Sequence, residues 1–274
     1  MKAKAIQKLR AKLADGQPVY GLWATLESAS VSEMAVSLDL DWVVVDAEHG
    51  HLDWRDILEH IRATVRSDTV VLVRIAELNI GLIKRVLDIG ADGVVVPWVE
   101  SAEQLRQAVA YAHYPPDGHR GMGGERATAW GQNLIAHIEE AEENVLIVPI
   151  IESVRGADNI EALLEVDGVD IYFFGPADFS ASAGHPGQWE GPGVAEKILR
   201  TRKAIDRLGR HSGVMIRDED DLHRRQREGF GMLGLGTDTG LLLRGLRGVL
   251  RAVDRDRELP VSLDPKDAEP RREE

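Results

Sequence analysis

Short apolar runs rich in valine, isoleucine and leucine recur along the chain, and segments with apolar residues at helical spacing separate them. A run that is apolar at nearly every position is typical of a strand buried on both faces, as in parallel sheets. Regular alternation of such strands with helices predicts an α/β fold, a closed (β/α)8 TIM barrel rather than an open doubly wound sheet. We expect eight strands, over Val19–Thr25, Trp42–Asp46, Val70–Ile75, Gly93–Pro97, Val145–Glu152, Asp170–Phe174, Gly213–Ile216 and Met232–Leu235.

The N-terminal segment Met1–Leu13 alternates basic and apolar residues at helical spacing, which predicts an amphipathic helix that caps the barrel. It lacks the apolar core of a signal peptide, and a transit peptide is the less favoured interpretation. The helices that alternate with the strands are expected over Ser32–Leu38, Trp54–Arg66, Ile80–Ile89, Ala102–Ala112, Asn159–Val166, Val194–Leu208, Asp218–Glu228 and Gly240–Val253.

One connection, between Ala112 and Asn144, is much longer than the others and contains a further predicted helix near Asn133–Glu142. Connections longer than about 12–15 residues are usually functional in a compact domain. Whether this one reaches the mouth of the barrel is left open by the sequence. Residues 255–274 are charged and lack apolar periodicity, which predicts a loosely held tail. We therefore expect one barrel domain over residues 1–254, followed by this tail.

Composition narrows the possible functions. The 274 residues suit a single barrel with a large core. The absence of cysteine excludes disulfides, thiolate metal ligands and iron–sulfur clusters. A net charge of −13 disfavours nucleic-acid binding, and no apolar run approaches the roughly 20 residues of a membrane span. We expect a cytoplasmic protein that binds neither nucleic acid nor membrane.

Candidate chemistry begins where the second predicted strand ends, at Asp46, Glu48 and His49. In α/β barrels the carboxyl ends of the strands carry the active site. His49 suits a general base because histidine exchanges protons near neutral pH, and Asp46 could accept its ring proton and orient it. A loop histidine with local contacts is the structural alternative. Glu48 could form a hydrogen bond to water on a bound metal ion, or it could simply face solvent.

Arg74 ends the third predicted strand, directly after three apolar residues. A buried guanidinium needs an anionic partner. A substrate carboxylate held by two hydrogen bonds is one such partner, and a salt bridge to Asp46 or Glu48 is the alternative.

Glu152 and Asp178 close the fifth and sixth predicted strands, so we expect them to lie side by side at the rim. Two adjacent carboxylates repel each other unless a cation lies between them, and oxygen ligands favour Mg²⁺, Mn²⁺ or a similar hard ion. A pair of exposed loop acids is the alternative. Since no lysine follows a predicted strand, a Schiff-base aldolase is disfavoured and carbanion stabilisation is assigned to a metal.

Five motifs in this order resemble the class II pyruvate aldolases of the HpcH/HpaI family, which includes 4-hydroxy-2-oxoheptanedioate and 2-dehydro-3-deoxyglucarate aldolases. The resemblance runs from about Gly21 to Leu250, and it rests on Asp46-x-Glu48-His49, Arg74, Pro115-Pro116-x-Gly118-x-Arg120-Gly121, Ile151-Glu152-Ser153 and Gly175-Pro176-Ala177-Asp178-x-Ser180. It implies a barrel of the phosphoenolpyruvate/pyruvate superfamily. It also implies a homohexamer, a trimer of dimers, in which neighbouring subunits exchange the last helix.

The resemblance also implies an activity: a divalent-metal-dependent aldolase that cleaves, or forms, a 4-hydroxy-2-oxo acid through a metal-stabilised pyruvate enolate. The small 2-oxo acid substrate would chelate Mg²⁺, Mn²⁺ or Co²⁺ held by Glu152 and Asp178. Arg74 matches the residue that binds pyruvate and stabilises the enolate. His49, paired with Asp46, matches the base that acts through metal-bound water on the 4-hydroxyl. The backbone amides of Ala177 and Asp178, after Gly175, match those that hold the pyruvate carboxylate.

Two positions depart from the family pattern and leave the aldehyde partner open. Many of these aldolases carry glutamine shortly before the glutamate ligand, whereas Ile150 stands on that side of the strand here. Trp98 follows Pro97 at a variable position, where it could narrow or line the pocket.

Other functions are also compatible with this barrel and these strand-end residues. The main alternative is an oxaloacetate decarboxylase or a macrophomate-synthase-like enolate enzyme. An acyl-CoA lyase of the citrate-lyase type is a further one, without a visible basic patch for the CoA tail. A non-catalytic carboxylate-binding or scaffold protein belongs to another class.

Overall fold

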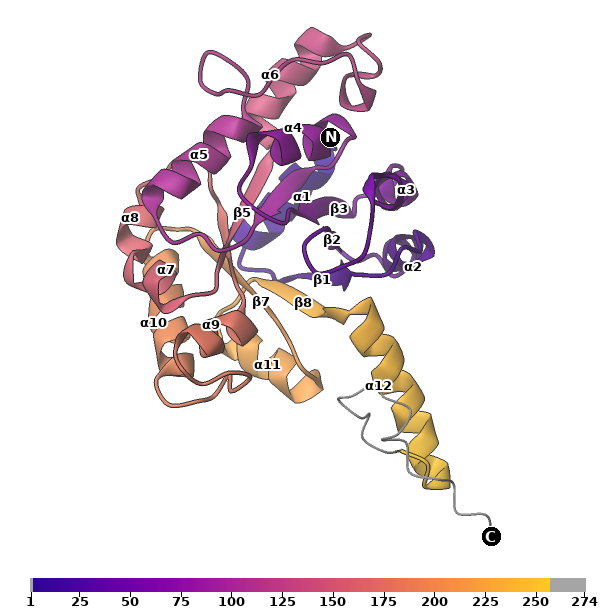
Figure 1. Cartoon of the computed structure of the whole chain (residues 1–274), viewed down its shortest axis with the longest axis vertical. Helices are drawn as coiled ribbons and strands as arrows, with labels where there is room; N and C mark the ends of the chain where they lie inside the picture. The colour runs from indigo at the N-terminus through magenta and orange to yellow at the C-terminus, as the bar shows by residue number, and fades with distance from the viewer. Residues whose placement is uncertain (1, 257–274) are drawn as a thin grey trace, which may run out of the picture. The chain divides into compact units, whose positions relative to one another are not determined.

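Eight parallel strands close into a barrel in the order of the sequence, in a computed structural model that describes residues 2–256 (Figure 1). This confirms the predicted TIM barrel. Most strand ends lie within one or two residues of the expected positions. The strands are β1 Val19–Ala24, β2 Trp42–Asp46, β3 Val70–Arg74, β4 Gly93–Val96, β5 Leu146–Ile151, β6 Ile171–Phe174, β7 His211–Met215 and β8 Met232–Thr237.

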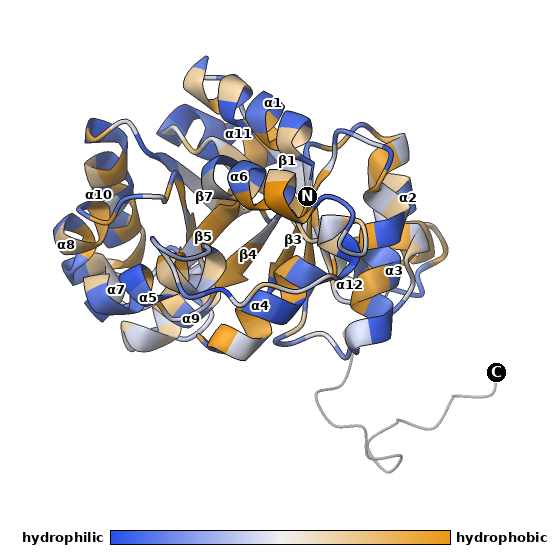
Figure 2. Ribbon diagram, turned by 90° about the horizontal axis from the view of Figure 1, so that it is seen from above, coloured by the Kyte–Doolittle hydropathy of each residue, from blue (hydrophilic) through white to orange (hydrophobic). Residues whose placement is uncertain are grey.

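Helices alternate with the strands, and those that precede residue 238 surround the barrel (Figure 2). Two short helices directly after β5 and β6, α7 and α9, escape the sequence pattern because one or two turns carry no measurable periodicity. The helices are α1 Ala3–Ala14, α2 Ser30–Ser37, α3 Trp54–Thr64, α4 Ile80–Asp88, α5 Ala102–Ala112, α6 Leu134–Asn144, α7 Val154–Asp158, α8 Ile160–Leu164, α9 Pro176–Ser182, α10 Val194–Arg207, α11 Glu219–Glu228 and α12 Asp238–Leu250, with 3-10 turns η1 Arg126–Thr128 and η2 Arg251–Val253.

The chain forms two compact units. Residues 1–238 hold all eight strands and α1 to α11. The second unit begins at Thr239 and contains nearly all of α12 together with η2. Most of the predicted charged tail, residues 257–274, lies outside the described residues.

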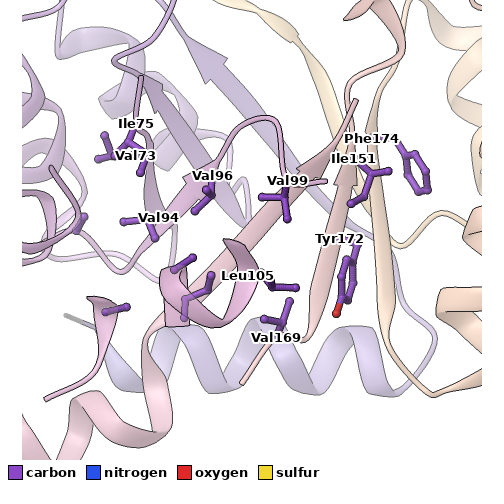
Figure 3. Packing of buried hydrophobic residues seen from close by; sticks show 14 of the residues in the cluster. Val73, Ile75, Val94, Val96, Val99, Leu105, Ile151, Val169, Tyr172 and Phe174 are labelled. Atoms are coloured by element: carbon purple, nitrogen blue, oxygen red, sulfur yellow. The ribbon is translucent and has the colours of Figure 1, made fainter. Parts of the chain in front are cut away.

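Side chains on each strand alternate between two buried clusters, as the period of a strand requires. Outward-facing residues such as Val94, Val96, Ile151 and Tyr172 pack against the surrounding helices (Figure 3). Inward-facing residues form a second cluster that fills the barrel, including Val19, Trp23, Trp42, Val44, Val70, Leu72, Val95, Leu146, Val148, Ile150, Ile171, Phe173 and Met232.

Helix α1 closes the end of the barrel opposite the carboxyl ends of the strands. Its apolar face, with Ile6 and Leu9, belongs to the same cluster as the inward-facing strand residues. At its start, the backbone N–H of Lys2 donates to Asp92 Oδ1 at 2.6 Å, and the Lys2 ammonium donates to the carbonyl of Thr69. The predicted capping helix is thereby located at the amino-terminal end of the strands.

The long connection after α5 lies on that same side of the molecule. Its Arg120 is almost fully buried and bonds Asp88 at the end of α4 at 2.8 Å, while Arg126 donates to the carbonyl of Ile89 at 2.9 Å. Both contacts lie at the α4–β4 turn, which precedes a strand. The connection therefore packs beside the base of its own barrel. Within residues 2–256, no helix combines the length and apolarity needed to cross a bilayer.

Candidate active site

The last inward-facing positions of three neighbouring strands bring Trp23, Asp46 and Arg74 together. Each lies two residues beyond an inward-facing residue of its own strand, so strand alternation directs all three into the barrel. Asp46 and Arg74 are also register partners on β2 and β3. The carboxyl ends of these strands thus form a buried polar layer above the apolar filling of the barrel.

Arg74 is held by two acids. Its Nε donates to Asp46 Oδ1 at 2.9 Å and its Nη2 donates to Asp46 Oδ2, while Nη1 lies 2.9 Å from Glu48 Oε2. Burial would raise the pKa of Asp46, but the hydrogen bonds and positive charge of Arg74 outweigh it and hold that pKa below its usual range. Burial also raises the pKa of Glu48, against the opposing effect of Arg74. The salt-bridge partners considered for Arg74 are therefore both present.

Asp46 is joined to His49 through the backbone rather than through the imidazole ring. Asp46 Oδ1 accepts the backbone N–H groups of Glu48 at 3.0 Å and His49 at 3.2 Å. Among residues 2–256 the ring of His49 has no hydrogen-bond or ion-pair partner. The expected ring contact with Asp46 is thus not formed, because Arg74 and the backbone of the turn occupy the carboxylate.

Trp23 is a residue of this layer that the strand-end motifs did not reveal. Its indole Nε1 donates to Asp46 Oδ2 at 3.1 Å, and the Arg74 guanidinium carbon lies 5.1 Å from the centre of its ring. Position in the strand could have identified it, because Trp23 follows Val19 and Gly21 on the inward face of β1. A motif search passes over it because tryptophan is ordinarily assigned to the core.

Glu152 follows β5 and is only 3% exposed. The charges of Asp178 and Glu48 act on its carboxylate. The backbone N–H of Trp98 donates to Glu152 Oε1 at 2.7 Å. Burial, together with the charges of Glu48 and Asp178, raises the pKa of Glu152 to about 7. An acid placed in this way is poorly compensated, since among residues 2–256 only one of its two oxygens accepts a hydrogen bond.

Gly175 leaves room for this carboxylate at the end of β6. A Cβ on residue 175 would lie 2.7 Å from Glu152 Oε2 and 3.2 Å from the side chain of Ile150. Half-buried Asp178 lies in the first turn of α9, where the N–H groups of Ala177 and Asp178 precede the helix hydrogen bonds. The Glu152 carboxylate therefore lies against Gly175, and the N–H groups of Ala177 and Asp178 follow directly in the first turn of α9.

The donor set fits a hard divalent cation. The carboxylates of Glu152 and Asp178 follow neighbouring strands, and the charges of Asp178 and of a third acid, Glu48, act on Glu152. Among residues 2–256, no group of three or more acids or histidines is arranged to enclose an ion. A site with two protein ligands leaves coordination positions for a chelating substrate and water.

Trp98 lies at the edge of the site, directly after Pro97 on the β4 side. Its side chain is 45% exposed, and its backbone has the left-handed φ of +51°. A non-glycine residue in this conformation is strained and is found mainly where the surroundings enforce it. Here the backbone directs an N–H toward Glu152 while the indole stays at the surface.

Two serines near the site have structural roles. Ser153 donates to Glu100 at 2.6 Å and accepts the N–H of Gly156 at the start of α7. Ser180 donates to the carbonyl of Ala177 at 2.7 Å. Both hydroxyls are therefore used in local contacts of the turns that follow β5 and β6.

Comparisons with known proteins assign the family. The HpcH/HpaI aldolase/citrate lyase family model matches residues 19–245. The 4-hydroxy-2-oxovalerate aldolase of Rhodococcus jostii (strain RHA1) is 34% identical over 240 residues, which cover 87% of this chain and 93% of that protein. The hydroxypyruvate/pyruvate aldolase of Pseudomonas aeruginosa is 34% identical over 246 residues, which cover 88% of this chain and 91% of that protein.

A solved structure gives the same result. An HpcH/HpaI aldolase/citrate lyase family protein from Burkholderia cenocepacia J2315 superposes with a TM-score of 0.85 at 32% identity, covering 90% of this chain and 98% of that one. The barrel and its acidic, arginine-containing rim are thus accompanied by similarity over nearly the whole length of the relatives. The chain therefore belongs to the HpcH/HpaI aldolase/citrate lyase family and is a class II pyruvate aldolase, a carbon–carbon lyase.

Proposed function

We propose that this aldolase cleaves a 4-hydroxy-2-oxo acid to pyruvate and an aldehyde, and joins the two in reverse, with a divalent cation held by Glu152 and Asp178. The observation that carries the proposal is that Glu152, buried at the end of β5, lies near enough to Asp178, Glu48 and Arg74 for their charges to act on its carboxylate. Cleavage needs a proton acceptor at the hydroxyl group and a positive site where enolate charge develops. His49 and Arg74 have those two properties.

Glu152 and Asp178 are the proposed ligands because, in the part of the chain that the structure describes, neither carboxylate forms a salt bridge. Bound between them, Mg²⁺, Mn²⁺ or Co²⁺ would act as a Lewis acid on the 2-oxo group. Burial and the neighbouring acids raise the pKa of Glu152, and a cation bound between the two carboxylates would oppose that effect.

Arg74 binds the 2-oxo acid through the guanidinium hydrogens that Asp46 and Glu48 leave free. Because the guanidinium is buried and already oriented, its charge is available to the enolate oxygen without reorganisation. The N–H groups of Ala177 and Asp178, beside Gly175, hold the substrate carboxylate. The exposed indole of Trp98 borders the aldehyde side of the site.

His49 takes the proton of the 4-hydroxyl group during cleavage and returns it during synthesis. Its ring is free to reach substrate because no other described side chain holds it. Asp46 supports this step indirectly, since it fixes the turn on which His49 is carried. Glu48 keeps Arg74 in place from the side opposite Asp46.

The decisive assay measures pyruvate release from a panel of 4-hydroxy-2-oxo acids and oxaloacetate, using protein treated with EDTA and then reconstituted with single metals. We expect release that requires Mg²⁺, Mn²⁺ or Co²⁺. No release from any member of the panel with any of these ions would refute the proposal.

Oxaloacetate decarboxylation is a second candidate, favoured by the finding that Asp46 contacts the backbone of His49 and does not orient its ring as it would for a general base. Decarboxylation uses the metal and Arg74 but removes no hydroxyl proton. The His49→Ala variant separates the two, because it should lose aldol cleavage while keeping decarboxylation. Aldol cleavage retained by this variant would remove His49 from the mechanism.

A homohexamer with exchanged C-terminal helices is the proposed assembly. Helix α12 supports it, since in the single chain its apolar side chains are exposed: Leu241, Leu242, Leu243, Leu246 and Val249. Light scattering after size exclusion should give a mass about six times the 30.2 kDa of the chain. A monomer at micromolar concentration would contradict this assembly.

A further inference from the structure

Trp23 contacts both members of the central ion pair of the site, although it has no part in the proposed chemistry. We propose that Trp23 is a positioning residue, which fixes the plane of the Arg74 guanidinium so that its free N–H groups face the substrate. The inference rests on the role proposed for Arg74 and extends it to the residue beneath it.

The first support is a shared hydrogen-bond acceptor. Asp46 Oδ2 receives both the indole N–H of Trp23, at 3.1 Å, and Nη2 of Arg74. The other oxygen, Oδ1, receives Nε of Arg74 and two backbone N–H groups. With both oxygens occupied in this way, the carboxylate cannot rotate without breaking several bonds at once. The direction of the guanidinium fork is therefore set in part by the indole.

The second support is the position of the ring itself. The guanidinium carbon of Arg74 lies 5.1 Å from the centre of the Trp23 ring, within the range of a cation–π contact. Trp23 is 7% exposed and Arg74 is 9% exposed, so water competes little with this attraction. The contact resists movement of the guanidinium away from the ring, whereas the hydrogen bonds to Asp46 fix its orientation in the plane.

The third support is that Trp23 is itself immobilised. Its ring packs against Phe173 of β6 with centroids 5.4 Å apart, and Phe173 also packs edge-on against Trp42 of β2, at 6.1 Å. These rings belong to the inward-facing cluster of the barrel. Trp23 thus connects the rigid core to a charged side chain, which is how catalytic groups are held within a fraction of an ångström of a productive geometry.

The test is a double-mutant cycle between Trp23→Phe and Arg74→Lys, using the metal-reconstituted enzyme and its best substrate from the panel. Trp23→Phe removes the indole N–H donor and leaves a smaller aromatic ring beneath the guanidinium of Arg74. We expect kcat to fall about tenfold with KM changed less than about twofold, because orientation matters most in the transition state. The inhibition constant of oxalate, a planar mimic of the pyruvate enolate, should rise by about the same factor as kcat falls.

Trp42→Phe is the matched control. It makes the same replacement beside the same Phe173, but its indole N–H faces the carbonyl of Val19 at 3.4 Å and not the ion pair. It should leave kcat and the oxalate constant within about twofold of the wild type. If Trp23→Phe does not fold, as judged by circular dichroism, Trp23→Tyr replaces it in the same cycle.

In an Arg74→Lys background, Trp23→Phe should have less than about a twofold further effect, since the group it positions is gone. An undiminished tenfold effect in that background would overturn the inference, because Trp23 would then act independently of Arg74. So would equal losses in the Trp23 and Trp42 variants, which would indicate general core damage. An Arg74→Lys enzyme with wild-type kcat would instead refute the proposed role of Arg74, and the inference with it.

Discussion

Arg74 and Asp46 face each other across neighbouring strands, and the guanidinium donates to both oxygens of the carboxylate. The pair is buried, so each charge depends on the other for compensation. Asp46, which the sequence motif associates with a catalytic histidine, thus binds an arginine side chain instead. This relationship makes Asp46 the residue through which the arginine and the histidine-bearing turn are held together.

Replacing Asp46 should therefore damage both activity and stability. In Asp46→Asn the shape is kept but the negative charge is lost, so Arg74 retains only Glu48 as a full counter-ion. We expect kcat/KM to fall by about 10²–10³-fold and the free energy of unfolding to fall by about 1–3 kcal/mol. Steady-state kinetics and urea unfolding measure the two effects.

The control for this variant is Asp68→Asn, which removes an exposed acid paired with Lys8 at the surface. Its unfolding free energy should stay within about 0.5 kcal/mol of the wild type. Equal changes in the two variants would mean that the buried pair has no special role.

Metal binding should become stronger as pH rises. Burial and the neighbouring acids raise the pKa of Glu152 to about 7, above its ordinary value in the unfolded chain. The folded metal-free protein therefore holds this proton more tightly, and the stabilisation it provides at low pH is lost as pH rises through about 7. A cation requires the ionised carboxylate and compensates it. We expect saturating Mn²⁺ to raise Tm by about 3–6 °C at pH 8 and by less than about 1 °C at pH 5.5.

The control for this experiment is Glu152→Gln, which cannot ionise. In that variant the metal-induced shift in Tm should be small at both pH values. A wild-type shift that is the same at pH 5.5 and pH 8 would contradict the assignment of Glu152 as a ligand.

Gly175 should be required by the shape of the proposed metal site. A methyl group at this position would lie 2.7 Å from Glu152 Oε2, closer than unbonded atoms approach. We expect Gly175→Ala to displace the carboxylate and to weaken metal affinity by about 10–100-fold, with the fold retained. Isothermal titration with Mn²⁺ measures the affinity. Gly123→Ala is the control, because its added methyl group would have its nearest neighbour at 3.8 Å. Unchanged affinity in Gly175→Ala would show that the carboxylate has room to move.

The backbone of Trp98 should be strained in the conformation that directs its N–H toward Glu152. Its φ of +51° is easy for glycine and costly for other residues. We expect Trp98→Gly to be more stable than Trp98→Ala by about 1 kcal/mol, since both lose the indole and only the alanine keeps the strain. Urea unfolding of the two variants gives the difference directly. A glycine variant no more stable than the alanine variant would refute the strain.

The barrel could be predicted from the sequence because its strands are buried on both faces and alternate regularly with helices. Runs such as Trp42–Asp46 therefore have nearly the same bounds in prediction and structure. The position of the long connection could not be predicted, since it depends on a buried pairing of Arg120 with Asp88, which is distant in sequence. Local periodicity contains no information about such a contact.

The sequence suggests the members of the candidate site, and it offers a salt bridge of Arg74 to Asp46 or Glu48 only as one of two alternatives. Strand ends identify Asp46, Arg74, Glu152 and Asp178 because polar residues after apolar runs are conspicuous. Which acid pairs with the arginine depends on register between strands, and Asp46 and Arg74 become partners only when the barrel closes. Trp23 was missed for a related reason: its polar N–H matters only beside a carboxylate from another strand.

The apolar filling of the barrel, closed below by α1, has a consequence for how this enzyme can evolve. Its inward-facing residues extend from Ile6 and Leu9 through Leu72 and Val148 up to the polar layer, and their packing does not depend on which aldehyde the enzyme accepts. Substitutions at exposed rim positions such as Trp98 can therefore accumulate without loss of the folded state. Enzymes with this barrel can change their substrate specificity with little loss of stability. The residues that keep the barrel folded differ from the residues on which selection for specificity acts.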